Sequence, residues 1–198
     1  MRWRPFFVLF FAALIYSGAI SLIMTYYFIV PGLGNSGADH WQTHFEKSGD
    51  HFIRINQREW DTPASKDWIE TIDQAVADYN LADVILIGHS LGCTAIANWA
   101  KQYQKKIKGA LLVAPSDLEA PRYTFDTVGF DRVPLDKINF KTIVVASSND
   151  EWVTLERAEF FAENWGSELI NIGSAGHINA DAGFGEWPEG LKILKTLG

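Results

Sequence analysis

Cysteine is nearly missing from this chain. Its 198 residues include one, Cys93, so no disulfide can form within the chain and folding requires no oxidising compartment. Cys93 lies three residues after Ser90. We expect a small, buried side chain at this point of a helix, with a redox role as the alternative.

Basic residues are also few, and they form no block. Lys and Arg number 17 against 24 Asp and Glu, which gives a formal net charge of -7 and a sequence pI near 5.2. Proteins that bind nucleic acid electrostatically usually carry a basic face. We therefore expect no nucleic-acid partner.

Motifs for metals and nucleotides are lacking as well. No His, Cys and carboxylate residues have metal-ligand spacing, so we predict no metal. The glycine-rich stretch Pro31–Gly37 reads PGLGNSG, which is neither G-x-G-x-x-G nor a Walker A sequence with its lysine. We therefore expect no cofactor.

The first 23 residues differ from everything that follows. After Arg2 and Arg4, the stretch Pro5–Ile23 is uncharged and mostly apolar over nineteen residues, close to the length that spans a bilayer. Taken alone, it predicts a signal anchor, or a signal peptide with a small-residue cleavage site at Ser17-Gly18-Ala19.

The chain leaves almost no linker between this run and the predicted strand Tyr26–Val30. A membrane helix would therefore enter the sheet directly, which favours a third interpretation, an upstream extension with the compact domain beginning at Met24. We set residues 1–23 apart under every interpretation and expect one domain over residues 24–198. We predict a cytoplasmic monomer, with anchorage to a membrane through residues 1–23 as the alternative.

Apolar, β-branched runs alternate with segments of helical periodicity after Met24. Such alternation predicts an α/β domain with a mostly parallel sheet covered by helices on both faces. The predicted strands are Tyr26–Val30, Phe52–Ile55, Val84–Ile87, Ala110–Ala114, Thr142–Ala146 and Glu168–Ile172, and the predicted helices are Asp39–Lys47, Ser65–Tyr79, Thr94–Gln102, Leu155–Trp165 and Glu189–Leu197.

The stretch Leu118–Phe140 has no clear periodicity and contains Pro121, Gly129 and Pro134. We expect it to form a small irregular excursion over the top of the sheet. It is too short to form a large cap domain, so we expect an open site.

The sharpest signal is Gly88-His89-Ser90-Leu91-Gly92, which separates the strand Val84–Ile87 from the helix Thr94–Gln102. This is the G-x-S-x-G pattern of a nucleophile elbow, in which glycines let the backbone turn tightly and expose the serine at the carboxyl end of a sheet. The plainer alternative is a tight turn in which Ser90 caps the following helix.

A serine hydroxyl is a poor nucleophile unless a base takes its proton, and a histidine held by a carboxylate is the usual base. The order Ser90, Asp150, His177 is that of α/β-hydrolases. Asp117, after the strand that follows the elbow helix, is the other candidate acid. We prefer Asp150 because its strand should lie beside the one that leads to His177.

His177 is the preferred base because it alone follows a late strand and has glycines around it. His40, His44 and His51 lie in the early helix and loop. His89 lies within the elbow, where we expect its side chain to pack or hydrogen-bond beside the serine.

Two further groups of residues are expected around Ser90. The backbone N–H groups of Leu33 and Leu91 should form the oxyanion hole, because they belong to the loop after the first core strand and to the residue after the nucleophile. Of the eight tryptophans, Trp152 and Trp187 lie close in sequence to Asp150 and His177, so we expect these two in a substrate pocket.

From about Met24 to the C-terminus, the chain resembles a known family, the small serine hydrolases of the YdeN and retinoblastoma-binding protein nine type. The resemblance rests on several motifs in order, which are Pro31–Gly37 with Asp39-His40-Trp41, then Gly88–Gly92, Ser148-Asn149-Asp150, Ala175–Asn179, Gly183-Phe184-Gly185 and Trp187-Pro188-Glu189-Gly190. It implies a compact α/β-hydrolase fold without a large cap, with Ser90 as nucleophile, Asp150 as acid and His177 as base.

One property of the family should not carry over. Retinoblastoma binding is associated with an L-x-C-x-E peptide, whereas this chain has alanine at the last position of Leu91-Gly92-Cys93-Thr94-Ala95. We expect a serine hydrolase of the carboxylesterase type that cleaves a small ester, or an amide, and needs no cofactor. The alternative is a non-catalytic protein that uses the same fold for binding.

Overall fold

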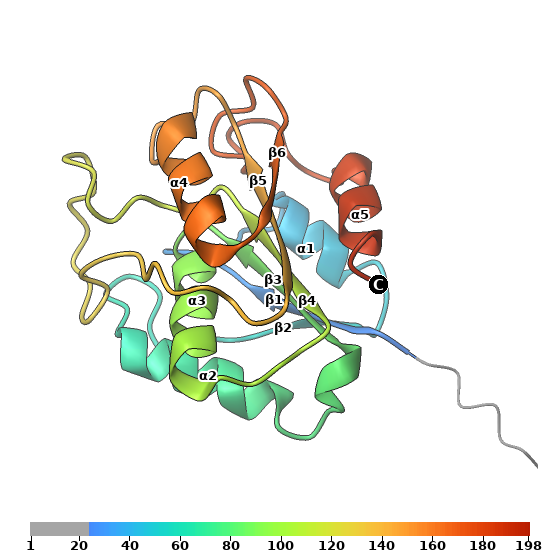
Figure 1. Cartoon of the computed structure of the whole chain (residues 1–198). Helices are drawn as coiled ribbons and strands as arrows, with labels where there is room; N and C mark the ends of the chain where they lie inside the picture. Colours follow the sequence, from blue (N-terminus) through green and yellow to red (C-terminus); the bar gives the residue numbers. More distant parts are fainter. Residues whose placement is uncertain (1–23) are drawn as a thin grey trace, which may run out of the picture.

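The computed structural model describes residues 24–198, so the predictions on residues 1–23 lie outside the described residues. The described part of the chain is built around one six-stranded sheet (Figure 1). Its strands are β1 (Tyr26–Val30), β2 (Phe52–Arg54), β3 (Val84–His89), β4 (Gly109–Val113), β5 (Lys141–Ala146) and β6 (Glu168–Asn171). Their order is β2-β1-β3-β4-β5-β6, and every pairing is parallel.

The strand sequences explain this order. Every residue of β3 and β4 is buried, because both lie inside the sheet and helices cover both of its faces. The edge strands β2 and β6 are only partly buried. Side chains of β3 alternate between two cores, with Val84 and Leu86 in one and Ile85 and Ile87 in the other.

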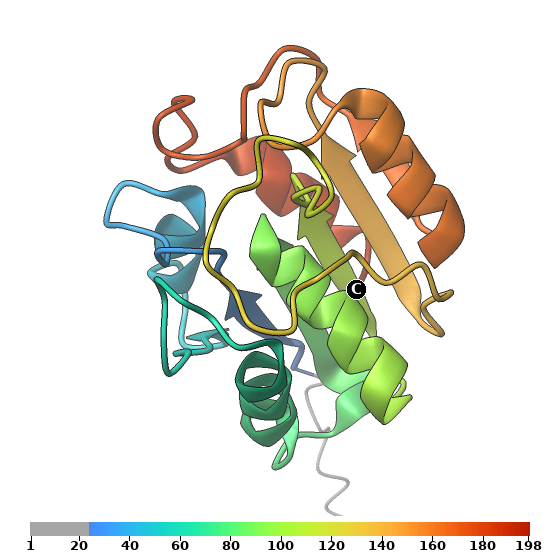
Figure 2. The same ribbon diagram turned by 90° about the vertical axis from the view of Figure 1, so that its left-hand side faces the viewer.

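Helices cover the two faces unequally (Figures 1 and 2). One face carries α2 (Ser65–Val76), α3 (Leu91–Tyr103) and α4 (Leu155–Trp165), and the other carries α1 (Trp41–Glu46) and α5 (Pro188–Lys195). The predicted α/β class with a parallel sheet covered on both faces is confirmed, and each predicted helix and strand is present within a few residues of its expected bounds.

Two of those bounds are wrong by three residues. Helix α2 ends at Val76 and not at Tyr79. The elbow helix α3 begins at Leu91, directly after Ser90, and not at Thr94. Gly92, in the first turn of this helix, is buried and lies close to the backbone at the end of β1 and in the loop after it. Close packing against that loop outweighs the low helix propensity of glycine.

Residues 118–140 join β4 to β5 without a helix or strand, as predicted. Figure 2 shows this stretch running beside α3. Its apolar side chains Phe130, Val133, Ile138 and Phe140 are buried in the core that α2, α3 and α4 share with the sheet. The connection therefore packs on the α3 face and leaves the carboxyl ends of the strands without a large cap.

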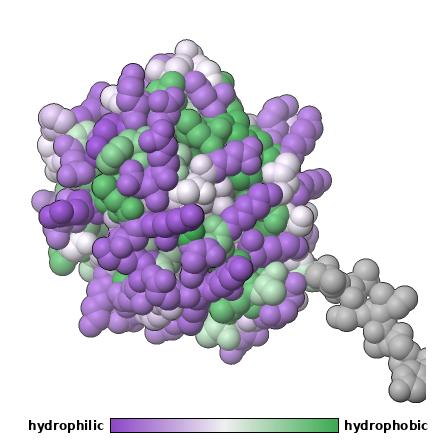
Figure 3. Space-filling model, viewed as in Figure 1, coloured by the Kyte–Doolittle hydropathy of each residue, from purple (hydrophilic) through white to green (hydrophobic). Residues whose placement is uncertain are grey.

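Charged and polar residues cover most of the face in Figure 3, with hydrophobic residues in small, separate patches. Within residues 24–198, none of the helices has the length and hydropathy needed to cross a bilayer.

Candidate active site

The serine of the elbow has a strained backbone, and its side chain does not cap the helix that follows. Ser90 has φ 55° and ψ -125°, a conformation that non-glycine residues rarely adopt and that is typical of functional sites. Its N–H donates to Val113 O at 3.0 Å, which fixes the turn to the neighbouring strand β4. The Ser90 side chain makes no capping hydrogen bond to α3, so the interpretation of Ser90 as a helix cap is wrong.

Two glycines allow the backbone around Ser90 to pack this closely. A Cβ on Gly92 would collide with the carbonyl oxygens of Val30 and Pro31, and a Cβ on Gly32 would lie 2.8 Å from Ser90 Cβ. The loop after β1 therefore lies directly against the elbow, which requires residues without side chains at both contact points.

The side chain of Gln42 holds the same loop in place through hydrogen bonds. It accepts from Ser36 Oγ at 2.7 Å and donates to Val30 O at 3.4 Å and Ile87 O at 3.2 Å, so it joins the loop to the ends of β1 and β3. Gln42 is fully buried. Sequence reasoning missed this residue, because a glutamine inside a short helix gives no signal of its partners.

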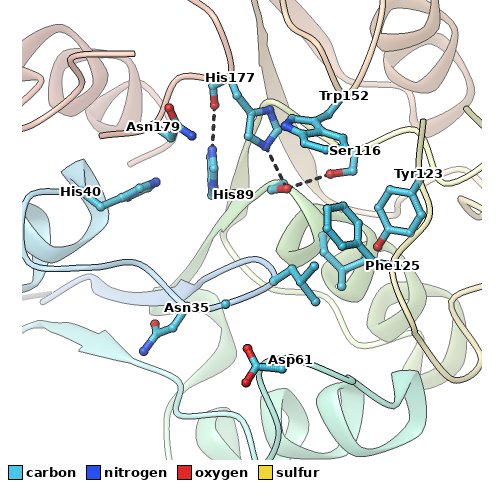
Figure 4. A pocket seen from close by; sticks show the side chains of 14 residues that line it. Asn35, His40, Asp61, His89, Ser116, Tyr123, Phe125, Trp152, His177 and Asn179 are labelled. Atoms are coloured by element: carbon cyan, nitrogen blue, oxygen red, sulfur yellow. Dashed lines mark hydrogen bonds between the residues drawn. The ribbon is translucent and has the colours of Figure 1, made fainter. Parts of the chain in front are cut away.

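The three residues predicted to carry the chemistry come together. His177 Nε2 lies 3.0 Å from Ser90 Oγ (Figure 4). His177 Nδ1 lies 2.9 and 3.0 Å from the two carboxylate oxygens of Asp150. A carboxylate can only accept at neutral pH, so Nδ1 carries the proton and Nε2 of the neutral ring faces the serine as an acceptor. This arrangement lets His177 take a proton from Ser90.

The Asp150 carboxylate is held in place by the turn that follows it. Its side chain is fully buried, and Oδ1 accepts from the backbone N–H of Trp152 at 2.8 Å. Two preceding side chains tie this turn to the histidine loop, because Ser147 Oγ accepts from Ala175 N at 2.9 Å and Asn149 Oδ1 accepts from Gly176 N at 2.8 Å. Their roles were not predicted from the sequence.

Asp117, the competing acid, is occupied elsewhere. Both of its carboxylate oxygens accept from the Arg157 guanidinium, at 2.8 and 3.0 Å, and the residue is 5 % exposed. The paired carboxylate raises the pKa of the arginine further. Asp117 therefore joins the end of β4 to α4, while Asp150 alone of the two contacts His177.

Two further histidines are buried behind His177. His89 Nε2 lies 2.9 Å from His177 O and must donate to it, since a carbonyl oxygen only accepts. The tip of the His40 ring points toward the His89 ring, with centroids 4.7 Å apart (Figure 4). Burial lowers the pKa of His89 well below its ordinary value. Burial, followed by the neighbouring Arg54 and His177, lowers the pKa of His40 to about 4. Both rings are thus neutral at pH 7.

The thiol of Cys93, in the helix that follows the elbow, is chemically inert. Cys93 is fully buried, its thiol lies 3.3 Å from Val113 O, and burial raises its pKa far above the ordinary value. A thiol without access to solvent and without thiolate character cannot support redox chemistry.

A pocket of about 460 Å³ opens at Ser90. Leu33 and Leu91, the residues expected to supply the oxyanion hole, both line it. Its aromatic wall is formed by Trp152 together with Tyr123 and Phe125 from the excursion (Figure 4). Tyr123 and Phe125 were not predicted as site residues, because the excursion lacks any periodicity that would orient its side chains.

Trp187, also expected in the pocket, is not there. It is 7 % exposed and packs against Trp41, Phe45 and Phe184 in the core beneath α1 and α5. Its place before α5 turns the ring toward the sheet, on the face opposite α3.

Among residues 24–198, no cluster of three or more His, Cys, Asp or Glu side chains is arranged to hold a metal ion.

The family model for serine hydrolases matches residues 27–196, nearly the whole described chain. This chain belongs to the serine hydrolase family. A curated relative named as a hydrolase, YdeN of Bacillus subtilis (strain 168), is 25% identical over 180 residues, which cover 85% of this serine hydrolase and 94% of YdeN.

Solved structures agree with this assignment. A protein described as a YdeN-like hydrolase from Pectobacterium atrosepticum is 39% identical, with a TM-score of 0.78 over 88% of this serine hydrolase and 90% of that chain. The YdeN structure itself has a TM-score of 0.70 at 20% identity and covers 88% and 98%. Est1E of Butyrivibrio proteoclasticus, solved with ferulic acid, shares the fold at a TM-score of 0.61 and 13% identity, over 88% and 92%.

Proposed function

We propose that this serine hydrolase cleaves a small ester through an acyl-enzyme on Ser90, and that amides react by the same steps. The observation that supports this most is the pair of contacts made by His177, with Nε2 3.0 Å from Ser90 Oγ and Nδ1 2.9 Å from Asp150. Nucleophile, base and orienting carboxylate thus lie in the order that acyl transfer needs.

In the first half of the reaction, Ser90 Oγ attacks the ester carbonyl carbon while its proton passes to His177 Nε2. The carbonyl π electrons move to the oxygen, and Asp150 stabilises the imidazolium that forms. When the tetrahedral intermediate collapses, the C–O bond to the alcohol breaks and His177 returns the proton to the leaving oxygen. Water then repeats both steps on the acyl-enzyme and releases the acid.

The N–H groups of Leu91 and Leu33 would stabilise the oxyanion. Leu91 is the first residue of α3, where helix N–H groups lack partners within the helix and the helix dipole favours negative charge. The close contact of Gly32 with the elbow brings the Leu33 loop to the same point.

The pocket lining combines an aromatic wall with one carboxylate, Asp61, and therefore disfavours an anionic substrate. Trp152 and Phe125 lie 5.2 Å apart between ring centroids, and Arg122 stacks over Trp152 at 4.9 Å while pairing with Glu151. The lining contains no Lys or Arg, and His40 and His89 are neutral, so nothing in it would compensate an anionic group.

Activity assays on matched variants test this proposal. The full chain should hydrolyse 4-nitrophenyl esters, with kcat/KM rising from acetyl to acyl groups that fill the aromatic wall, and the corresponding 4-nitroanilides should be slower. Ser90→Ala and His177→Gln should each lose about 10³-fold or more in kcat, by analogy with nucleophile and base removal in other triads.

Equal hydrolysis by wild type and Ser90→Ala would refute the mechanism. A wild type that binds these esters without turnover would favour the non-catalytic binding protein instead.

A further inference from the structure

A second hydroxyl contacts the proposed nucleophile. Ser116 Oγ lies 2.8 Å from Ser90 Oγ and lines the pocket on the side of the aromatic wall (Figure 4). Ser116 follows β4 and is 3 % exposed. Neither the triad pattern nor the elbow motif assigns a role to this position.

The direction of this hydrogen bond follows from counting protons. His177 Nδ1 carries its proton toward Asp150, so Nε2 accepts and the single Ser90 hydroxyl proton points to Nε2. Ser90 then has no proton left for Ser116. The bond between the two hydroxyls must therefore run from Ser116 O–H to Ser90 Oγ.

From this geometry we propose that Ser116 is a catalytic residue whose hydroxyl stabilises Ser90 Oγ as it attacks; the proposal rests on the acyl-enzyme mechanism proposed above. As the Ser90 proton moves to His177 and the Oγ lone pair forms the new bond to carbon, negative charge builds on Oγ. The Ser116 proton is not transferred, but its hydrogen bond strengthens with that charge. In deacylation the same donor stabilises Oγ as the leaving group.

The backbone before Ser116 is held in a strained form. Ala114 has φ 47°, in the left-handed region that residues with a Cβ rarely adopt. Its N–H donates to Val145 O at 2.8 Å, which continues the sheet up to the point where the chain turns. Such strain persists only where the surrounding structure fixes it, and it gathers at functional sites.

The residue after Ser116 is anchored equally firmly. Asp117 N donates to Trp152 O at 3.1 Å, and its carboxylate forms the two hydrogen bonds to Arg157. Ser116 is therefore fixed between β5 on one side and the Asp150 turn and α4 on the other. This support places the hydroxyl against Ser90 before substrate binds, as preorganised stabilisation requires.

The test is the rate at which Ser90 attacks a fluorophosphonate, where Oγ bonds to phosphorus and fluoride leaves. Ser116→Ala should lower both this second-order rate constant and kcat/KM for an ester by about 10- to 100-fold, with KM little changed, since a hydrogen bond to a charged group is lost. Ser116→Thr keeps the hydroxyl and should recover the rate to within about threefold of wild type.

A matched control separates chemistry from packing. Thr142 Oγ1 and Ser167 Oγ form a similar hydroxyl pair at 2.6 Å, at the start of β5 and far from the site along the strand. Thr142→Val should lower the unfolding midpoint without slowing inactivation.

Each outcome decides the proposal. Wild-type speed or faster attack in Ser116→Ala overturns it, and so does a loss confined to KM or a folded Ser116→Thr protein that stays slow. If the wild type is labelled at no site or at a residue other than Ser90, the proposed mechanism itself fails and this inference falls with it.

Discussion

Two aspartates follow the neighbouring strands β4 and β5, and their surroundings give them different tasks. Asp150 orients the ring of His177, while Asp117 is neutralised by Arg157. The sequence favoured Asp150 through its place in the predicted strand order and kept Asp117 as an alternative, because each follows a strand at the same edge of the sheet. Their partners depend on which neighbour supplies a cation and which supplies an imidazole, and no local pattern encodes that choice.

Replacement of each aspartate by asparagine should separate the two roles. Asp150→Asn keeps the shape of the side chain but allows the wrong His177 tautomer, and we expect kcat to fall by about 10³- to 10⁴-fold, with the fold retained. Asp117→Asn should mainly lower the unfolding midpoint, because Arg157 loses a charged partner. Steady-state kinetics with urea unfolding on both variants checks this, and a larger kcat loss in Asp117→Asn would reverse the assignment.

At the scale of elements, β3 and α3 pack tightly against the loop after β1. Gly92 lies in the first turn of α3, where alanine would ordinarily stabilise a helix by about 0.5–1 kcal/mol. Here the added Cβ would collide with two backbone carbonyl oxygens, Val30 O and Pro31 O. We expect Gly92→Ala to reduce the free energy of unfolding by about 1–3 kcal/mol, the usual cost of overpacking.

Urea unfolding measures this change, with Gly37→Ala as the control. A Cβ on Gly37 would meet nothing within 4 Å, so its effect should stay within about 0.5 kcal/mol. A Gly92→Ala protein as stable as wild type would show that the elbow tolerates a side chain there.

The histidine loop is held by a hydrogen bond to the turn that follows β5. Asn149→Ala removes the acceptor of the Gly176 N–H. We expect this change to displace His177 from Ser90 while the free energy of unfolding changes little. We expect kcat to fall by about 10- to 100-fold, since small displacements of a catalytic group are costly. Asn171→Ala is the control, because Asn171 Oδ1 accepts from Gly173 N at the other end of the loop. Equal kcat values for both variants would contradict this role of Asn149.

At the scale of the whole molecule, the alternation of apolar strands and helices was sufficient to predict the parallel sheet. Buried strands such as β3 need continuous apolar residues on both faces, and this requirement is visible in sequence. The pocket wall was less predictable. Tyr123 and Phe125 lie in an aperiodic connection, and Trp187 near the histidine loop could as well have faced the core, where it in fact packs.

The buried histidines should make the stability of the whole domain depend on pH. The pKa of His40 is lowered to about 4, first by burial and then by Arg54 and His177, whereas in the unfolded chain it is near 6.5. The unfolded state therefore binds more protons between these values, and stability is lost as pH falls from about 6.5 toward 4. For His40 the loss is on the order of 3 kcal/mol, and His89 adds a loss of the same sign.

Unfolding in urea at pH 7.5, 6 and 5 measures this dependence. His40→Asn keeps an acceptor for the Gln42 N–H that His40 Nδ1 now caps but removes the titrating ring, so its curve should be flatter. An unchanged pH dependence in this variant would mean that His40 does not contribute.

The central claim is that Ser90 is a nucleophile activated by His177, and a mapped covalent adduct tests it most directly. The full chain is treated with a fluorophosphonate, digested, and analysed by mass spectrometry with fragmentation that distinguishes Ser90 from the nearby Cys93 and from Ser116. We predict one adduct per chain, on Ser90, and labelling slowed by about 10³-fold or more in His177→Gln. An adduct elsewhere, or undiminished labelling of Ser90→Ala, would contradict the account.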